Sequence, residues 1–200
     1  NEMKERIAHL IGHQARGLWA GTFHSVCARI LRADGAPIGV ESNFVIYDES
    51  DQIALVKQCL SVLDVDSQQF KPSDVHWAIS AAKNELIGVL EYGRNRRGLF
   101  EEVVHRVYAL YQQKLRENNA LDFDDLLMRT VELFVQSPGT LEAYQERFHY
   151  ILVDEYQDIN HAQYQFVKHL AAKRRNLCVV GDDDQSIYGW RGSNVRIILE

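Results

Sequence analysis

The sequence predicts an α/β fold in which a partial parallel sheet, with helices on both faces, is interrupted by an all-helical insertion. Strand–helix units occur towards both ends of the 200-residue chain, whereas residues from about Ser50 to Asn118 show only helical periodicity. The middle of the chain also differs in charge. Eight basic and five acidic side chains between Lys71 and Arg116 give that stretch +3, against −6 for the whole chain.

Apolar residues at helical spacing predict helices, and short apolar runs bounded by polar residues predict strands. The helices are expected at residues 1–12, 24–32, 51–60, 75–87, 100–115, 121–134, 141–148 and 163–170. The strands are expected at residues 18–23, 44–47, 150–153 and 177–180.

Helix boundaries are predicted from capping residues and turn residues. Asp48 or Ser50 is suited to cap the helix after the strand at 44–47. Asp122 is suited to cap the helix that follows it, with Asp124 and Asp125 at the positive end of the helix dipole. Breaks are expected at residues 34–37, 93–98, 118–119 and 137–139, of which 93–98 is a basic loop.

The last two predicted strands both end in polar residues. Ile151–Asp158 reads Ile-Leu-Val-Asp-Glu-Tyr-Gln-Asp, and Val179–Gly192 reads Val-Val-Gly-Asp-Asp-Asp-Gln-Ser-Ile-Tyr-Gly-Trp-Arg-Gly. Apolar runs of this kind are typical of buried parallel strands. Ligands bind at the carboxyl ends of such strands in open α/β sheets, so the sequence predicts a polar ligand site at this edge.

Composition excludes some classes of protein. An apolar share of 46% is enough for a packed core, and a net charge of −6 argues against a protein that coats nucleic acid. No run approaches the roughly 18 apolar residues that span a bilayer. Cys27, Cys59 and Cys178 are widely spaced in apolar surroundings, which predicts buried reduced thiols in a cytosolic protein. Trp19 and Trp77 also lie in apolar patterns and are expected in the core.

The acids after the strand at 150–153 have the form of a Walker B element. Asp154 would hold Mg²⁺ on a nucleotide, directly or through water, and Glu155 would orient and deprotonate the water that attacks the γ-phosphate. The alternative is that both are ordinary acids that cap the next helix. Two observations together favour the catalytic interpretation. The acids belong to the extended form Asp-Glu-Tyr-Gln-Asp, and a second polar strand end follows about two dozen residues later.

These two segments resemble motifs II and III of superfamily 1 DNA helicases of the UvrD/PcrA/Rep branch. Gly21–Ser25 followed by Ala28–Arg32 resembles motif Ib, and Leu121–Leu127 resembles the segment that re-enters the first motor domain after its insertion. Asn1–Ile7 is similar to the helix after motif Ia. The resemblance thus covers the whole chain and implies a RecA-like P-loop NTPase core.

The resemblance implies a role for particular residues. Gln185 would sense the γ-phosphate, and Arg191 would link the nucleotide to DNA. The residues expected to contact single-stranded DNA are Thr22, Phe23, His24, Tyr188, Trp190 and Arg191. Aromatic rings suit a protein that binds single strands without sequence preference, because every base can stack on them.

The resemblance also implies a division of the chain. Residues 1–48 would belong to motor domain 1A, residues 49–118 to the helical insertion 1B, and residues 119–200 to 1A again. Arg94, Arg96 and Arg97 would lie near DNA in the insertion, where they would contact phosphates, unless they form only a solvated loop.

The function implied is that of an ATP- and Mg²⁺-dependent 3′–5′ DNA helicase or translocase. It would act in repair or replication on single strands and junctions, in the cytoplasm at the bacterial nucleoid. The chain begins and ends within elements and contains no Gly-Lys pair, so no Walker A loop. We therefore expect a piece of a longer protein that hydrolyses essentially no ATP alone. Two alternatives remain, a RecB/AddA-type helicase–nuclease subunit and a degenerate DNA-binding scaffold.

Overall fold

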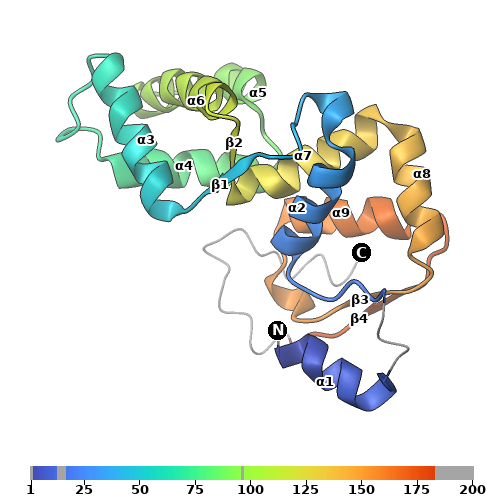
Figure 1. The fold of residues 1–200 in the computed structure, drawn as a ribbon. Helices are drawn as coiled ribbons and strands as arrows, with labels where there is room; N and C mark the ends of the chain where they lie inside the picture. Colours follow the sequence, from blue (N-terminus) through green and yellow to red (C-terminus); the bar gives the residue numbers. More distant parts are fainter. Residues whose placement is uncertain (1, 13–16, 96, 183–200) are drawn as a thin grey trace.

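The structure, a computed structural model, describes residues 2–12, 17–95 and 97–182. They form a mixed α/β arrangement of mostly helices with two pairs of short strands (Figure 1). Strand β1 (Val45–Tyr47) pairs in parallel with β2 (Ala120–Asp122). Strand β3 (Ile151–Val153) pairs in parallel with β4 (Leu177–Val179). The parallel strands and abundant helices agree with the predicted α/β class.

Helices make up most of the described chain. Their bounds are α1 Glu2–Ile11, α2 Phe23–Asp34, α3 Glu49–Val62, α4 Pro72–Asn84, α5 Val89–Asn95, α6 Leu99–Glu117, α7 Phe123–Gln136, α8 Pro138–Arg147 and α9 His161–Ala171. The described residues also include the 3₁₀ turns η2 (Ala36–Ile38) and η3 (Tyr156–Asp158). Between Glu49 and Glu117 the described residues contain helices and no strand. None of the described helices is both long and apolar enough to cross a membrane.

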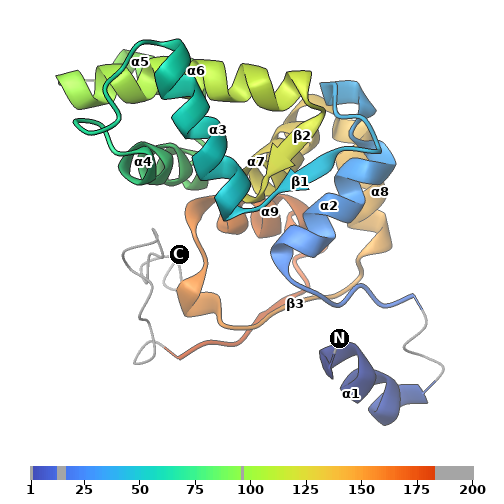
Figure 2. The same ribbon diagram turned by 60° about the vertical axis from the view of Figure 1, so that its left-hand side comes forward.

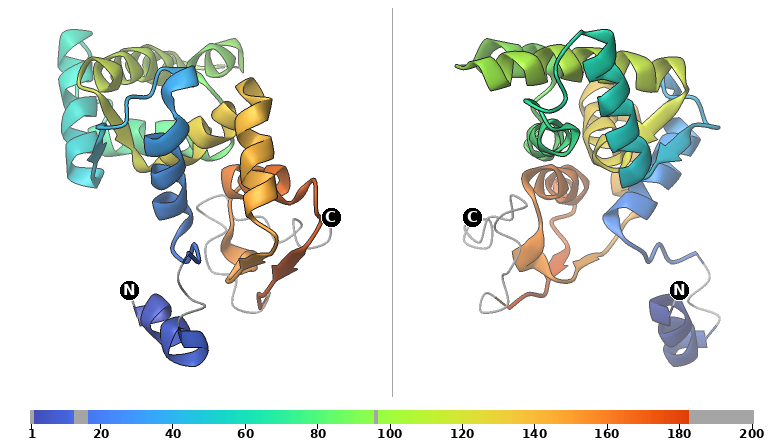
Figure 3. Two further views of the ribbon diagram at one scale, coloured as in Figure 1. Left: turned by 45° about the vertical axis from the view of Figure 1, so that its right-hand side comes forward. Right: turned by 90° about the vertical axis from the view of Figure 1, so that its left-hand side faces the viewer.

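The buried apolar side chains form two clusters. Core A is built from α2, α7, α8 and α9 together with Val153 of β3, and core B from α3, α4 and α6 together with Ala120 of β2. The views in Figure 2 and Figure 3 show α3–α6 gathered on one side, with α7 reaching from them towards α2, α8 and α9. Helix α1 lies apart from both groups (Figure 3).

Three helices begin with reciprocal capping boxes. In α3 the side chain of Asp48 accepts from the backbone N–H of Asp51, and in α7 Asp122 accepts from Asp125 in the same way. In each box the side chain of the residue at the third helical position accepts a hydrogen bond from the backbone N–H of the cap residue. The predictions that Asp48 and Asp122 are caps are therefore confirmed. Asn160 caps α9 with the same geometry.

The strand predicted at residues 18–23 is wrong. Leu18–Gly21 has no regular structure, and Thr22 caps α2, so that Phe23 is already helical. Side-chain packing explains the difference. The ring of Trp19 packs against Phe148, and the backbone around Trp19 pairs with none of the described strands. The sequence also missed β2, where residues 120–122 pair with β1 before α7 begins, and α5, which occupies part of the predicted basic loop.

Three expectations of burial are also wrong. β3 buries Val153 in core A but leaves Leu152 76% exposed, because each of the two strands has one partner within the described residues and one face stays uncovered. Trp77 is 58% exposed on α4, whose buried side is formed by other residues. Cys178 on β4 is exposed, whereas Cys27 and Cys59 are buried free thiols as expected.

A buried ammonium group joins core B to core A. Lys83 of α4 is 0% exposed, and its Nζ donates to Asp122 Oδ2 at 2.6 Å, Asp125 Oδ1 at 2.8 Å and Gln112 Oε1 at 2.9 Å. All three N–H donors of the ammonium therefore have acceptors. Tyr111 adds a hydrogen bond from its hydroxyl to Asp122 Oδ2 at 2.9 Å. We call these five residues the Lys83 cluster.

The charges of Lys83 and Asp122 stabilise each other. Burial alone would lower the pKa of Lys83, but the carboxylates of Asp122 and Asp125 outweigh it and hold that pKa above its ordinary value. Burial would likewise raise the pKa of Asp122, yet the charge of Lys83 holds it below its ordinary value. Lys83 therefore stays an ammonium and Asp122 a carboxylate at neutral pH.

Removing the ammonium should destabilise the chain strongly. We expect Lys83→Met to lower the free energy of unfolding by about 3–5 kcal/mol, because Asp122 and Asp125 lose their buried counter-ion. Urea denaturation followed by circular dichroism measures the change. The control is Lys57→Met on the exposed side of α3, with an expected change within about 0.5 kcal/mol. A loss below about 1 kcal/mol in Lys83→Met would contradict this role of the cluster.

Candidate functional site at the exits of β3 and β4

The carboxyl ends of β3 and β4 lie at the same edge, as the sequence predicts. The strands pair in register, with Val153 opposite Val179. Beyond them, Val180 N donates to Val153 O at 2.8 Å, and Tyr156 N donates to Val180 O at 2.9 Å. The backbone bonds of the ladder therefore continue past both strands into the segments that carry the polar residues.

Asp154 and Glu155 are both exposed at this edge. One oxygen of Asp154, Oδ1, accepts from the backbone N–H of Glu155 at 3.0 Å. Glu155 has left-handed backbone angles, with φ 51° and ψ 43°. Such angles are uncommon for a residue with a side chain, and backbone strain of this kind is often found at functional sites.

The exposed carboxylates fit a Mg²⁺–nucleotide. Magnesium in phosphate-binding sites usually takes one or two protein carboxylates and completes its shell with waters and phosphate oxygens. The exposed carboxylate of Asp154 can meet this need. In the described part of the chain no group of three or more acidic, His or Cys side chains could hold a metal by itself, so a protein-only metal centre is not built there.

Four predicted site residues lie outside the described residues. They are Gln185, Tyr188, Trp190 and Arg191, all beyond Asp182, where the description ends. Their roles remain predictions. Asp182 itself lies at the exit of β4, where its backbone N–H donates to Gln157 Oε1 at 3.0 Å.

Thr22, Phe23 and His24 lie together at the start of α2 but face different surroundings. Thr22 is exposed and accepts from Ser25 N through Oγ1 at 3.3 Å. Phe23 is half-buried and meets Phe166 edge-on at 6.1 Å between ring centroids. Of the three, Thr22 and His24 therefore offer polar groups to a ligand, while Phe23 packs at the margin of core A.

His24 is accompanied by an aromatic residue that the sequence did not single out. Its ring meets Phe123 edge-on at 5.6 Å, and Phe123 is 44% exposed at the first position of α7. Burial lowers the pKa of His24, so its ring is neutral at neutral pH. A signal was available in the sequence, since an apolar side chain directly after a helix cap lies in the first turn, before the apolar face of α7 begins.

Gln157 is the second residue near this site that the sequence did not single out. It belongs to the acidic stretch after β3, yet it is buried, and its Nε2 donates to Glu155 Oε2 at 2.7 Å. The sequence motif contains this residue but indicates no role for it. No feature of the sequence distinguishes a buried amide from an exposed one in a 3₁₀ turn, so this contact required the structure.

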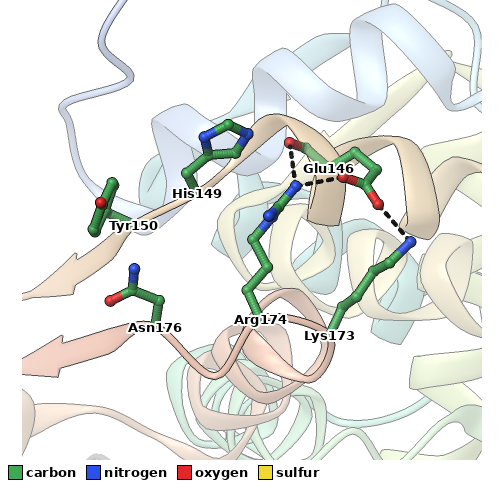
Figure 4. Close-up of a pocket in the computed structure, with 6 residues that line it drawn as sticks. All are labelled: Glu146, His149, Tyr150, Lys173, Arg174 and Asn176. Carbon is green, nitrogen blue, oxygen red and sulfur yellow. Dashed lines mark hydrogen bonds and ion pairs between the residues drawn. The ribbon is translucent and has the colours of Figure 1, made fainter.

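A hollow of about 520 Å³ lies at the opposite edge, near the amino ends of β3 and β4 (Figure 4). It is lined by Glu146, His149, Tyr150, Lys173, Arg174 and Asn176. Both cations in it are paired, since Lys173 Nζ lies 2.6 Å from Glu146 Oε1 and Arg174 also contacts Glu146 (Figure 4). The hollow therefore does not offer the free positive charge that a nucleotide phosphate needs.

Comparison with known proteins assigns the class. The family described as UvrD/REP helicase N-terminal domain matches residues 1–200. Proteins named ATP-dependent DNA helicase PcrA from Staphylococcus epidermidis and Staphylococcus aureus are each 51% identical over 198 residues. The aligned region covers 99% of this chain and 27% of each relative. The chain belongs to the UvrD/REP helicase family, and it spans 27% of the length of these curated relatives.

Proposed function

We propose that this chain is part of an ATP-driven DNA helicase or translocase that moves 3′ to 5′ on single strands and unwinds duplex at junctions. The observation that carries the proposal is the pair of exposed carboxylates at the exit of β3, held beside the exit of a parallel strand. Family membership and two relatives named ATP-dependent DNA helicases support it.

Asp154 and Glu155 divide the chemistry at this edge. Asp154 would hold Mg²⁺, directly or through a water, and the ion would neutralise charge on the phosphates of ATP. Glu155 would orient the attacking water and accept its proton. Gln185 and Arg191, which follow β4 in the sequence, would contact the phosphates and carry the state of the nucleotide to DNA.

The DNA strand would contact residues at the start of α2 and residues of the segment that follows β4. Thr22 and His24 at the start of α2 would contact it, with Phe23 beside them and with Tyr188 and Trp190 stacking on bases. Phe123 extends this surface, because its exposed ring stands against His24. Stacked aromatic rings bind single strands without regard to sequence.

The proposal includes an architecture. Residues 1–48 and 119–200 would belong to a RecA-like motor domain 1A, and residues 49–118 would form the helical insertion 1B. This division is supported by α3, α4 and α6, which supply most of core B, while Ala120 of β2 joins that core from outside residues 49–118. Arg94 in the last turn of α5 and Arg97 after it are exposed and would contact DNA phosphates, as would Arg96, which lies outside the described residues. The protein would act in the cytoplasm, at the nucleoid, in repair or replication.

The general-base role of Glu155 has a direct test. In the full-length protein that carries this chain, we expect Glu155→Gln to lower DNA-stimulated ATP turnover roughly 10²- to 10⁴-fold, because the water loses its proton acceptor. ATP affinity should change little. Release of labelled phosphate and nucleotide titration measure the two quantities, with the exposed Glu41→Gln as control. Turnover within twofold of wild type in Glu155→Gln would exclude this role.

The aromatic surface is tested through DNA binding. Phe123→Ala in the full-length protein should weaken binding of a fluorescent single strand about 5- to 150-fold, the loss of one stacked base. The matched control is Phe100→Ala, since Phe100 is also exposed but lies at the far end of α6 from β2. Equal losses in both variants, or none in Phe123→Ala, would remove Phe123 from the surface.

A further inference from the structure

Gln157 occupies an unusual position between the two strand exits. It lies in η3, two residues after Glu155, and is 1% exposed although the carboxylates before it face solvent. Its Nε2 donates to Glu155 Oε2 at 2.7 Å, and its Oε1 accepts from Asp182 N at 3.0 Å. One buried side chain therefore contacts the segment after β3 and the segment after β4.

The orientation of this amide is fixed by its two neighbours. A backbone N–H can only donate, so it must face the amide oxygen, and an ionised carboxylate can only accept, so it must face the amide nitrogen. Rotating the amide by 180° would place its NH₂ group against the backbone N–H of Asp182 and its oxygen against the carboxylate of Glu155. An amide satisfies both contacts at once because it carries a donor and an acceptor.

Gly181 leaves room for the amide. A Cβ at this position would stand 2.6 Å from Gln157 Oε1, closer than real contacts allow. The glycine at the exit of β4 thus lets the backbone approach the Gln157 side chain. The backbone bond from Tyr156 N to Val180 O at 2.9 Å closes the same junction one residue earlier.

The contact restricts an otherwise free carboxylate. Glu155 is exposed, and an exposed Glu side chain samples several rotamers. Holding Oε2 leaves Oε1 available for another ligand while the carboxylate stays in one orientation. Catalytic rate is sensitive to such placement, since a displacement of about 1 Å can cost roughly 100-fold.

We infer that Gln157 is a positioning residue, whose buried amide holds the Glu155 carboxylate in place and couples that placement to the exit of β4. The inference rests on the proposed function, in which Glu155 is the general base. Gln157 itself touches neither water nor phosphate in this role. It acts through Glu155, and through Asp182 it joins that base to the segment that leads to Gln185.

The test uses DNA-stimulated ATP turnover by the full-length protein. Gln157→Met keeps the length of the side chain and removes both polar contacts, and it should lower kcat roughly 10- to 100-fold while KM for ATP stays within about twofold. The matched control is Gln52→Met, because Gln52 is a buried amide in α3 whose Nε2 bonds to Tyr47 O far along the chain from Glu155. It should leave kcat unchanged.

A double-mutant cycle separates positioning from a merely structural role. In the Glu155→Gln background the carboxylate is gone, so Gln157→Met should lower the residual turnover no further. An equal loss in both backgrounds would mean that Gln157 acts on the fold, and would overturn the inference. So would a wild-type kcat in Gln157→Met.

Gln157→Asn covers the case in which Gln157→Met does not fold. This variant keeps an amide donor and acceptor but is one carbon shorter, so it cannot contact Glu155 and Asp182 N at once, and we expect a folded protein with low kcat. Normal kcat in Gln157→Asn would overturn the inference. Failure of the proposed function gives a different pattern, because Glu155→Gln would then itself retain turnover.

Discussion

The ion pairs of Lys83 are the constraint on which the arrangement of the chain depends. A single buried ammonium on α4 is bound by Asp122 and Asp125, and Asp122 is at the same time the cap of α7. The contact that fixes core B therefore also fixes where α7 starts. Breaking such a pair leaves buried charge without a partner, so the two cores are held in one relative placement.

Both candidate surfaces follow from that placement. Phe123 comes directly after Asp122, so the Lys83 cluster also sets the position of the ring that stands against His24. Next to Lys83, Asn84 accepts a hydrogen bond from Asn160, the cap of α9. Helix α9 begins shortly after the turn that carries Gln157, and α4 contacts the cap of α9 on one side and α7 on the other.

Much of this could be predicted from the sequence because local rules decide it. Strand exits rich in acids and amides, and Asp residues before apolar helical patterns, placed β3, β4 and two helix caps correctly. The predictions that failed are those that depend on tertiary contacts. The run at 18–23 has the composition of a strand, but Trp19 finds aromatic partners and Thr22 caps a helix. The pairing of β2 with β1 and the contact of Gln157 with Glu155 join groups whose meeting no local pattern encodes.

We propose that ATP hydrolysis at the carboxylates after β3 drives movement along a single strand of DNA. Displacement of streptavidin from biotinylated oligonucleotides by the full-length protein measures this movement, since release requires both hydrolysis and directed motion. We expect ATP-dependent release from the 5′ end and little from the 3′ end. Release from the 3′ end alone, or release from neither end while the protein still binds the oligonucleotide, would contradict it.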